Sequence, residues 1–138
     1  MLRARNWIFN DQPEQDNQMK ATLFQRCGGF ATVHRVVLSF YDKVLDSDIL
    51  GPYFEDVDMP RLIDHQTKFI SQVMGGPTTY TNEVLEQLHR HLEIDQSAFD
   101  EMTTLLEQTL CEFQFGDEDV NQIMREIKSR QPYIVNVT

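Results

Sequence analysis

Apolar residues recur at helical spacing along most of the chain. Val33, Val37, Phe40 and Val44 follow one another three or four positions apart, which predicts a helix over residues 30–45. No alternation of apolar and polar residues typical of a strand continues for more than a few positions, so we expect an all-α fold. The same helical spacing predicts further helices over residues 59–73, 85–94, 97–113 and 118–130, and a short helical turn over residues 22–26.

Glycine, proline and aspartate separate these predicted helices. Gly28–Gly29 indicates a backbone hinge, because glycine adopts positive φ at little cost. Asp58 is suited to cap the helix that follows it, and Gly75–Pro77 ends that helix. Pro132 stops the last helix. The spacing therefore predicts distinct helices joined by short turns.

The chain divides into one domain and two short ends. Residues 1–20 are polar and rich in Asn, Asp and Gln, so we expect a flexible N-terminal extension. Residues 21–132 carry the helical pattern and are long enough for a single domain with its own core. Residues 133–138 are expected to form a C-terminal tail.

Charge and composition restrict the kinds of molecule that we expect this protein to bind. The formal net charge is −10, from 22 acidic and 12 basic side chains, and this field repels nucleic acid and anionic membrane surfaces. No apolar run approaches the ~20 residues that cross a bilayer, and no signal peptide is evident. Cys27 and Cys111 lie far apart without metal-ligand spacing. We expect a cytoplasmic monomer or weak dimer.

One histidine shares an apolar helix face. Leu85, Leu88 and Leu92 form a stripe at a spacing of three and four, and His89 lies on it when residues are placed about 100° apart. His91 points away from that stripe, towards the rim or solvent. A neutral imidazole in this position is either a core residue bonded to the backbone or a metal ligand.

Two further polar groups interrupt apolar faces. Gln66 lies between Leu62 and Phe69 on one face of its helix, and Tyr41 lies at the edge of the preceding helix's apolar face. His65 lies at the margin of the Gln66 face. A buried amide without a partner costs about 1–3 kcal/mol, so either the protein or a ligand must supply one.

The chemistry suggested by these groups is that of a cofactor pocket. The sequence has no glycine-rich phosphate loop, no HExxH motif and no compact Ser/His/Asp set, and its four histidines and two cysteines lack zinc-ligand spacing. What remains is one histidine, His89, that faces a Tyr41/Gln66 pair from two other helices. This layout suits iron with one protein ligand and one position open to a small molecule.

An ordered series of motifs extends from Gly28 to about Leu110. In this order and spacing the motifs resemble the truncated haemoglobins, the two-over-two globins, and most of all their first group. The motifs are Gly28-Gly29, Phe40-Tyr41, Val44-Leu45, Pro52-Tyr53-Phe54, Asp58-Met59, Arg61-Leu62, His65-Gln66, Phe69, Gly75-Gly76-Pro77, Tyr80, Leu88-His89, Leu92, Ile94 and Phe99.

The resemblance implies a two-over-two helical sandwich around haem, with a short proximal helix. It makes His89 the proximal ligand to haem iron, Tyr41 the distal hydroxyl that donates to bound oxygen, and Gln66 its amide partner. Leu62 would stand where ordinary globins carry a distal histidine. The residues it places around haem are Phe54, Leu62, His65, Gln66, Phe69, Ile70, Tyr80, Leu85, Leu88, His89, Ile94 and Phe99. Tyr80 and basic groups near Arg61 and Arg90 are its candidates for the propionates.

Two positions depart from the family pattern, and the role of one histidine stays open. Arg26-Cys27 stands where the family tends to have leucine, and Asn82 replaces a common glycine before the His89 helix. His65 could reach a haem propionate or solvent. Alternatively, His65 could bind iron in the ligand-free state, in which case an external ligand must displace it.

The expected function is reversible binding of a diatomic ligand, O2, NO or CO, with oxygen transport among the roles this implies. Nitric oxide dioxygenation with a separate reductase is one activity that the resemblance allows, and peroxidase-like chemistry is another. The alternative is a haem-based gas sensor or an interaction module without catalysis, with His65 as an internal sixth ligand. A globin-like domain that has lost haem is disfavoured, since it would have no use for His89 facing Tyr41 and Gln66.

Overall fold

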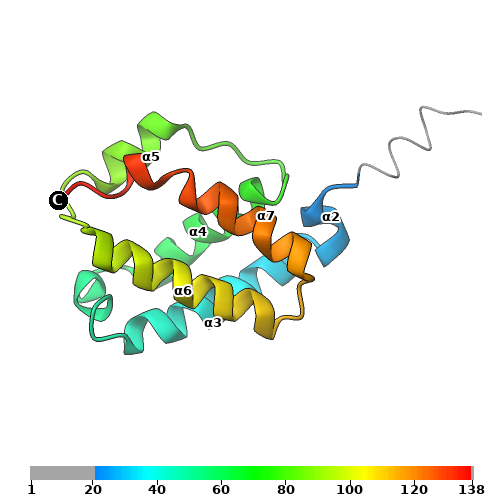
Figure 1. Cartoon of the computed structure of the whole chain (residues 1–138), viewed down its shortest axis with the longest axis horizontal. Coiled ribbons are helices and arrows are strands. Elements are labelled where there is room, and N and C mark those ends of the chain that lie inside the picture. The colour runs from blue at the N-terminus through cyan, green and yellow to red at the C-terminus, as the bar shows by residue number, and fades with distance from the viewer. Residues whose placement is uncertain (1–20, 138) are drawn as a thin grey trace, which may run out of the picture.

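The structure, a computed structural model, describes residues 21–137. The predicted flexible extension over residues 1–20 and the last residue of the predicted tail lie outside this part. The described part is helical, with no strand, as predicted (Figure 1). Its elements are α2 (Leu23–Cys27), α3 (Phe30–Asp46), the 3-10 turn η1 (Gly51–Phe54), α4 (Met59–Val73), α5 (Asn82–His89), α6 (Gln96–Glu112), α7 (Asp117–Lys128) and the 3-10 turn η2 (Gln131–Tyr133).

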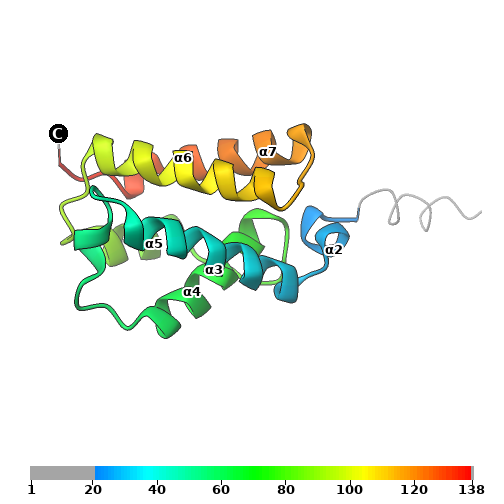
Figure 2. The same cartoon turned by 90° about the horizontal axis from the view of Figure 1, so that it is seen from below.

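Two pairs of helices form the two layers of the fold. α3 packs against α4, α6 packs against α7, and α3 also packs against α6. Figure 2 shows α6 and α7 in one layer, with α3 and α4 in the other. The two-over-two arrangement expected from the sequence is therefore confirmed. No helix in residues 21–137 has the length and apolarity needed to cross a bilayer.

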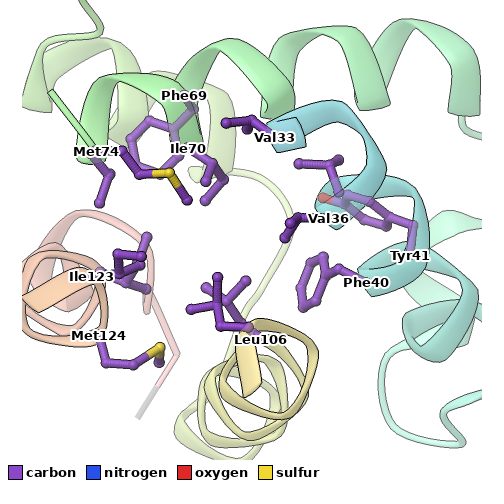
Figure 3. Close-up of a cluster of buried hydrophobic side chains, with 14 of the residues drawn as sticks. Val33, Val36, Phe40, Tyr41, Phe69, Ile70, Met74, Leu106, Ile123 and Met124 are labelled. Atoms are coloured by element: carbon purple, nitrogen blue, oxygen red, sulfur yellow. The ribbon is translucent and has the colours of Figure 1, made fainter. Parts of the chain in front are cut away.

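The core lies between these layers. Val33, Val36 and Val44 of α3, Leu110 of α6 and Ile123 of α7 are almost completely buried. Figure 3 shows apolar side chains from α3, α4, α6 and α7 pointing toward one another. Each such side chain contributes roughly 1.5–3 kcal/mol on burial, so these four helices supply most of the apolar stabilisation.

The predicted limits of the long helices hold to within two residues. α4 spans the predicted residues 59–73, and Asp58 caps it by accepting a hydrogen bond from the Arg61 N–H at 3.2 Å. A glycine turn follows the other end of α4. There Gly75 has φ of 90°, a left-handed conformation that favours glycine, and the Phe24 N–H donates to the Met74 carbonyl at 2.9 Å. This bond ties α2 to the end of α4.

The prediction of a helix over residues 85–94 is wrong in its limits. α5 begins at Asn82, capped by the Thr81 hydroxyl, and ends at His89. Glu93 then has φ of 53°, a left-handed conformation that a continuing α-helix cannot include. The short helix expected on this side of the molecule is thus present, but it begins three residues earlier and ends five residues earlier than predicted, with His89 at its last position.

Candidate functional site

An apolar cavity of about 240 Å³ lies between α3, α4, α5 and α6. α7 contributes Ile127 to its wall, and the segment after η2 contributes Ile134. The polar side chains that reach the wall are Tyr41, Tyr53, Gln66 and His89. A mostly apolar cavity with a few convergent polar groups is typical of small-molecule and cofactor sites.

His89 is held in one ring orientation. Its Nδ1 lies 2.7 Å from the Leu85 carbonyl oxygen, one turn earlier in α5. A carbonyl only accepts, so Nδ1 carries the proton and the Nε2 lone pair is left available. Burial lowers the pKa of His89 below its ordinary value, and the bond to Leu85 opposes this with a smaller effect. A neutral, oriented imidazole is the form that binds a metal.

Tyr41 presents a buried phenol from α3. The side chain is 7% exposed, and its ring packs edge-on against Phe40 at 4.9 Å and Phe54 at 5.7 Å between centroids. Burial raises the pKa of Tyr41 well above its ordinary value, so the hydroxyl stays protonated and can donate. It makes no hydrogen bond with any side chain or backbone group of residues 21–137.

Gln66 presents a half-buried amide from α4 to the same cavity. Its side chain also makes no hydrogen bond within the described part of the chain, whereas the Tyr53 hydroxyl donates to the Glu93 carbonyl at 3.2 Å. Tyr41 and Gln66 therefore bring unused hydrogen-bonding capacity into an apolar space. A small polar molecule in the cavity can take up this capacity, and an amide can either donate to it or accept from it.

Comparison with known proteins identifies the family to which this fold belongs. The sequence profile of the bacterial-like globin family matches residues 22–136. A group 1 truncated haemoglobin of Tetrahymena thermophila is 30% identical over 107 residues, which cover 78% of this chain and 88% of that protein. The chain belongs to the truncated globins of group 1.

Solved structures agree with this assignment. The truncated haemoglobin of Tetrahymena pyriformis in its Fe(III) form is 25% identical, with a TM-score of 0.77 over 84% of this chain and 99% of that chain. The two-over-two haemoglobin of Synechococcus sp. PCC 7002, in the cyanomet state with covalently attached haem, has a TM-score of 0.78 at 24% identity, over 84% and 99% of the two chains. The latter likeness supports the fold.

Haem is therefore the cofactor of this globin, and globins bind diatomic gases at haem iron. The residues that line the cavity are suited to bind haem. The cavity wall offers one oriented neutral imidazole as a nitrogen donor and aromatic and aliphatic side chains as contacts for the porphyrin. The Tyr41 hydroxyl and the Gln66 amide, which have no hydrogen-bond partner among residues 21–137, belong to the same wall.

Most residues that the sequence placed around haem lie in the cavity wall. Their individual roles stay predictions, but the fold brings them together from α3, η1, α4, α5, α6 and the segment between α5 and α6. They are Tyr41, Phe54, Leu62, Gln66, Phe69, Ile70, Leu85, His89, Ile94 and Phe99.

The structure leaves Leu88 outside this wall. Its side chain is 56% exposed. Leu85 and His89, four positions apart, both face the cavity, and Leu88 lies about 100° round the helix from His89. The predicted apolar stripe therefore included a residue that α5 turns to solvent.

His65 and Tyr80 also lie outside the wall. His65 is exposed on α4, and its Nδ1 lies 3.4 Å from the Tyr80 hydroxyl oxygen. Tyr80 is held in turn by Gln72, whose side chain bonds both backbone groups of Tyr80, and by an edge-on contact with Phe69 at 6.1 Å between centroids. Arg61 and Arg90 are exposed.

The cavity wall contains further residues to which the sequence assigned no site role. Several of them lie on helix faces predicted to point inward, so helical spacing was a sufficient signal for those. Ile134 is different, because it lies beyond the last helix and belonged to the predicted tail. The added residues are Val37, Phe40, Val44, Leu50, Tyr53, Val57, Leu92, Ala98, Met102, Leu106, Ile127 and Ile134.

Proposed function

We propose that this globin binds a diatomic gas reversibly, with His89 as the protein ligand to haem iron. The proposal is carried by one observation: a single apolar cavity holds an oriented neutral imidazole and two polar side chains that have no hydrogen-bond partner in the described part of the chain. Haem, when bound, supplies the iron at which the gas is held. The chain supplies the orientation of the ring through Leu85 and excludes water from the site.

Tyr41 and Gln66 favour dioxygen over an apolar gas. The Tyr41 phenol remains protonated because its pKa is raised by burial, so it donates a hydrogen bond to a polarised dioxygen molecule. Gln66 donates a second bond or orients the Tyr41 hydroxyl. A hydrogen bond to a charged or polarised acceptor in a low-dielectric site contributes about 1.5–3 kcal/mol.

The remaining wall residues would hold the porphyrin. Phe54 would pack on the porphyrin, and Phe69 and Ile70 would line the distal side or a ligand tunnel. Arg61 and Arg90, which are exposed and lie outside the wall, are candidates for the propionates. His65, exposed beside Tyr80, would leave the distal position open to an external ligand. Nitric oxide dioxygenation, peroxidase-like activity, a reductase partner, a sensor role and a cytoplasmic location stay predictions from the sequence.

The test is spectroscopic. Purified protein reconstituted with haem should give a Soret band, and the dithionite-reduced protein should bind CO and O2. Absence of a Soret band after haem addition would overturn the proposal.

Tyr41→Phe tests the role of the distal hydroxyl. Loss of one charge-assisted hydrogen bond should speed O2 dissociation by about 10- to 100-fold in stopped flow. CO dissociation should change far less, because CO accepts hydrogen bonds weakly. Tyr133→Phe, which removes a hydroxyl from a residue 36% exposed outside the cavity, is the matched control. An O2 off-rate equal to that of the control would exclude Tyr41 as the donor.

A further inference from the structure

The chain returns to α5 after its last turn. Ile134, 9% exposed, lies in the cavity wall. Two residues later the Asn136 N–H donates to the Ile94 carbonyl at 2.9 Å, and the Val137 N–H reaches the same oxygen at 3.2 Å. The described end of the predicted tail is therefore attached to the segment that follows His89.

The Asn136 side chain bonds both ends of that segment. Its Nδ2 donates to the His89 carbonyl at 2.6 Å and to the Arg90 carbonyl at 2.9 Å. Its Oδ1 accepts from the Ile94 N–H at 2.8 Å. One carboxamide thus closes residues 89–94 into a fixed loop, using both its donor and its acceptor.

The α5 segment has few other means of being held. α5 is eight residues long, and Leu85 is the only residue of this helix that is buried. Isolated helices of this length are marginal in water, and the last carbonyls of a helix have no partner within it. The His89 carbonyl accepts one bond from beyond the helix, from the Leu92 N–H at 3.0 Å. Asn136 donates a second bond to it and also bonds the Arg90 carbonyl, from a part of the chain more than 40 residues away.

We propose that Asn136 is a positioning residue for His89, acting from outside the cavity through the His89 backbone. The Leu85 carbonyl fixes rotation of the imidazole, and Asn136 fixes the backbone from which the ring projects. The proposal rests on the proposed role of His89 as the iron ligand. It assigns the two halves of the carboxamide separate tasks, the donor holding the end of α5 and the acceptor holding Ile94.

Two variants separate these tasks. Asn136→Ala removes the donor and the acceptor together. Asn136→Asp keeps an acceptor for the Ile94 N–H and places a carboxylate against the His89 and Arg90 carbonyl oxygens. Asn121→Ala, which truncates an exposed asparagine on α7, is the matched control.

The first readout is amide hydrogen exchange by NMR on the haem-free full-length chain. Exchange of the Ile94 N–H should be about tenfold faster or more in Asn136→Ala, and close to wild type in Asn136→Asp and Asn121→Ala. Equal exchange rates in all four proteins would overturn the proposed contact. This readout does not depend on what His89 binds.

The second readout is the iron–histidine stretching band in the resonance Raman spectrum of the ferrous, haem-loaded protein. The band should shift or broaden in both Asn136 variants beyond its difference between wild type and Asn121→Ala. Haem transfer to an acceptor apoprotein should be about 10- to 100-fold faster in both. Lowered thermal stability with an unchanged band would reduce Asn136 to a structural role and overturn the proposal.

The two proposals fail differently. A wild-type protein that takes up haem without an iron–histidine band contradicts the role of His89, and with it the positioning of an iron ligand by Asn136. A normal wild-type band that is identical in Asn136→Ala contradicts the role of Asn136 alone.

Discussion

The two sides of the cavity are built in different ways. The side formed by α3 and α4 consists of helices of 17 and 15 residues, each with at least five buried residues. The side formed by α5 is an eight-residue helix with Leu85 as its one buried residue, followed by a loop with Glu93 at positive φ. Apolar burial holds the first side in place. Directional hydrogen bonds hold much of the second.

The polar groups on the two sides also differ in how many hydrogen bonds they make within the protein. Tyr41 and Gln66 have no hydrogen-bond partner among residues 21–137, so their capacity is free for a molecule in the cavity. The His89 ring is bonded to Leu85, and its backbone carbonyl is bonded to Asn136. A site that binds and releases a small molecule beside a fixed metal ligand needs this difference. Side chains whose hydrogen bonds are made within the protein stay in place, and side chains without a partner are free to bond the incoming molecule.

The largest expected effect comes from removing the imidazole. His89→Ala should lower haem affinity by at least about 100-fold and abolish the iron–histidine band, since the site loses its nitrogen donor. Added imidazole should restore part of the ferrous spectrum. A haem titration followed at the Soret band measures the affinity. His91→Ala, which removes the exposed neighbouring histidine, should bind haem as the wild type does. Equal losses in both variants would contradict the assignment of His89.

Leucine truncation tests whether α5 depends on a single apolar contact. Leu85→Ala should lower the free energy of unfolding by about 2–5 kcal/mol, because it empties a buried position beside the cavity. Leu88→Ala should change that free energy by no more than about 0.5 kcal/mol, since the side chain is 56% exposed. Urea unfolding of the haem-free proteins measures both. Similar costs would show that the two leucines share one buried stripe, as the sequence predicted.

A smaller effect is expected from pH. Burial lowers the pKa of His89 in the folded chain below the value of about 6.5 found in an unfolded one. The unfolded chain then takes up the proton first, so the His89 contribution to stability is complete above about pH 6.5 and is lost as the pH falls below it. Urea unfolding of the haem-free protein at pH 7.5 and 5.5 should show a larger loss in wild type than in His89→Leu. An equal loss in both would assign the acid sensitivity to other groups.

The smallest effect is expected at His65. His65→Ala should leave the visible spectrum of the reduced, ligand-free protein unchanged, because the ring is exposed beside Tyr80 and lies outside the cavity wall. Sharp, split visible bands in the wild type that disappear in the variant would instead assign His65 as an internal sixth ligand. Absorption spectra of the two dithionite-reduced proteins distinguish these outcomes.

Helical periodicity was sufficient to predict much of the α3 and α4 side of the cavity. Val33, Val37 and Val44 of α3 are buried as their spacing predicted, and Asp58 caps α4. Tyr41 and Gln66 could be selected because each is a polar residue on or beside an otherwise apolar face. A long amphipathic helix repeats its signal over several turns, so one ambiguous position changes little.

The α5 side was harder to predict for a physical reason. An eight-residue helix gives only about two turns of pattern, so Leu88 was assigned inward and the helix was extended five residues beyond His89. No sequence pattern indicated that Ile134 lines the cavity, since its position depends on the path of the chain after η2.

The sequence alone determined the all-α class, the order of the main helices and the three polar side chains that meet in the cavity, because periodicity and composition are local properties. The tertiary structure decided where α5 ends, that Leu88 and His65 lie outside the cavity, and that Asn136 bonds the His89 and Arg90 carbonyls. Those outcomes depend on contacts between residues more than 40 positions apart or on the rotation of a short helix. No local pattern encodes them.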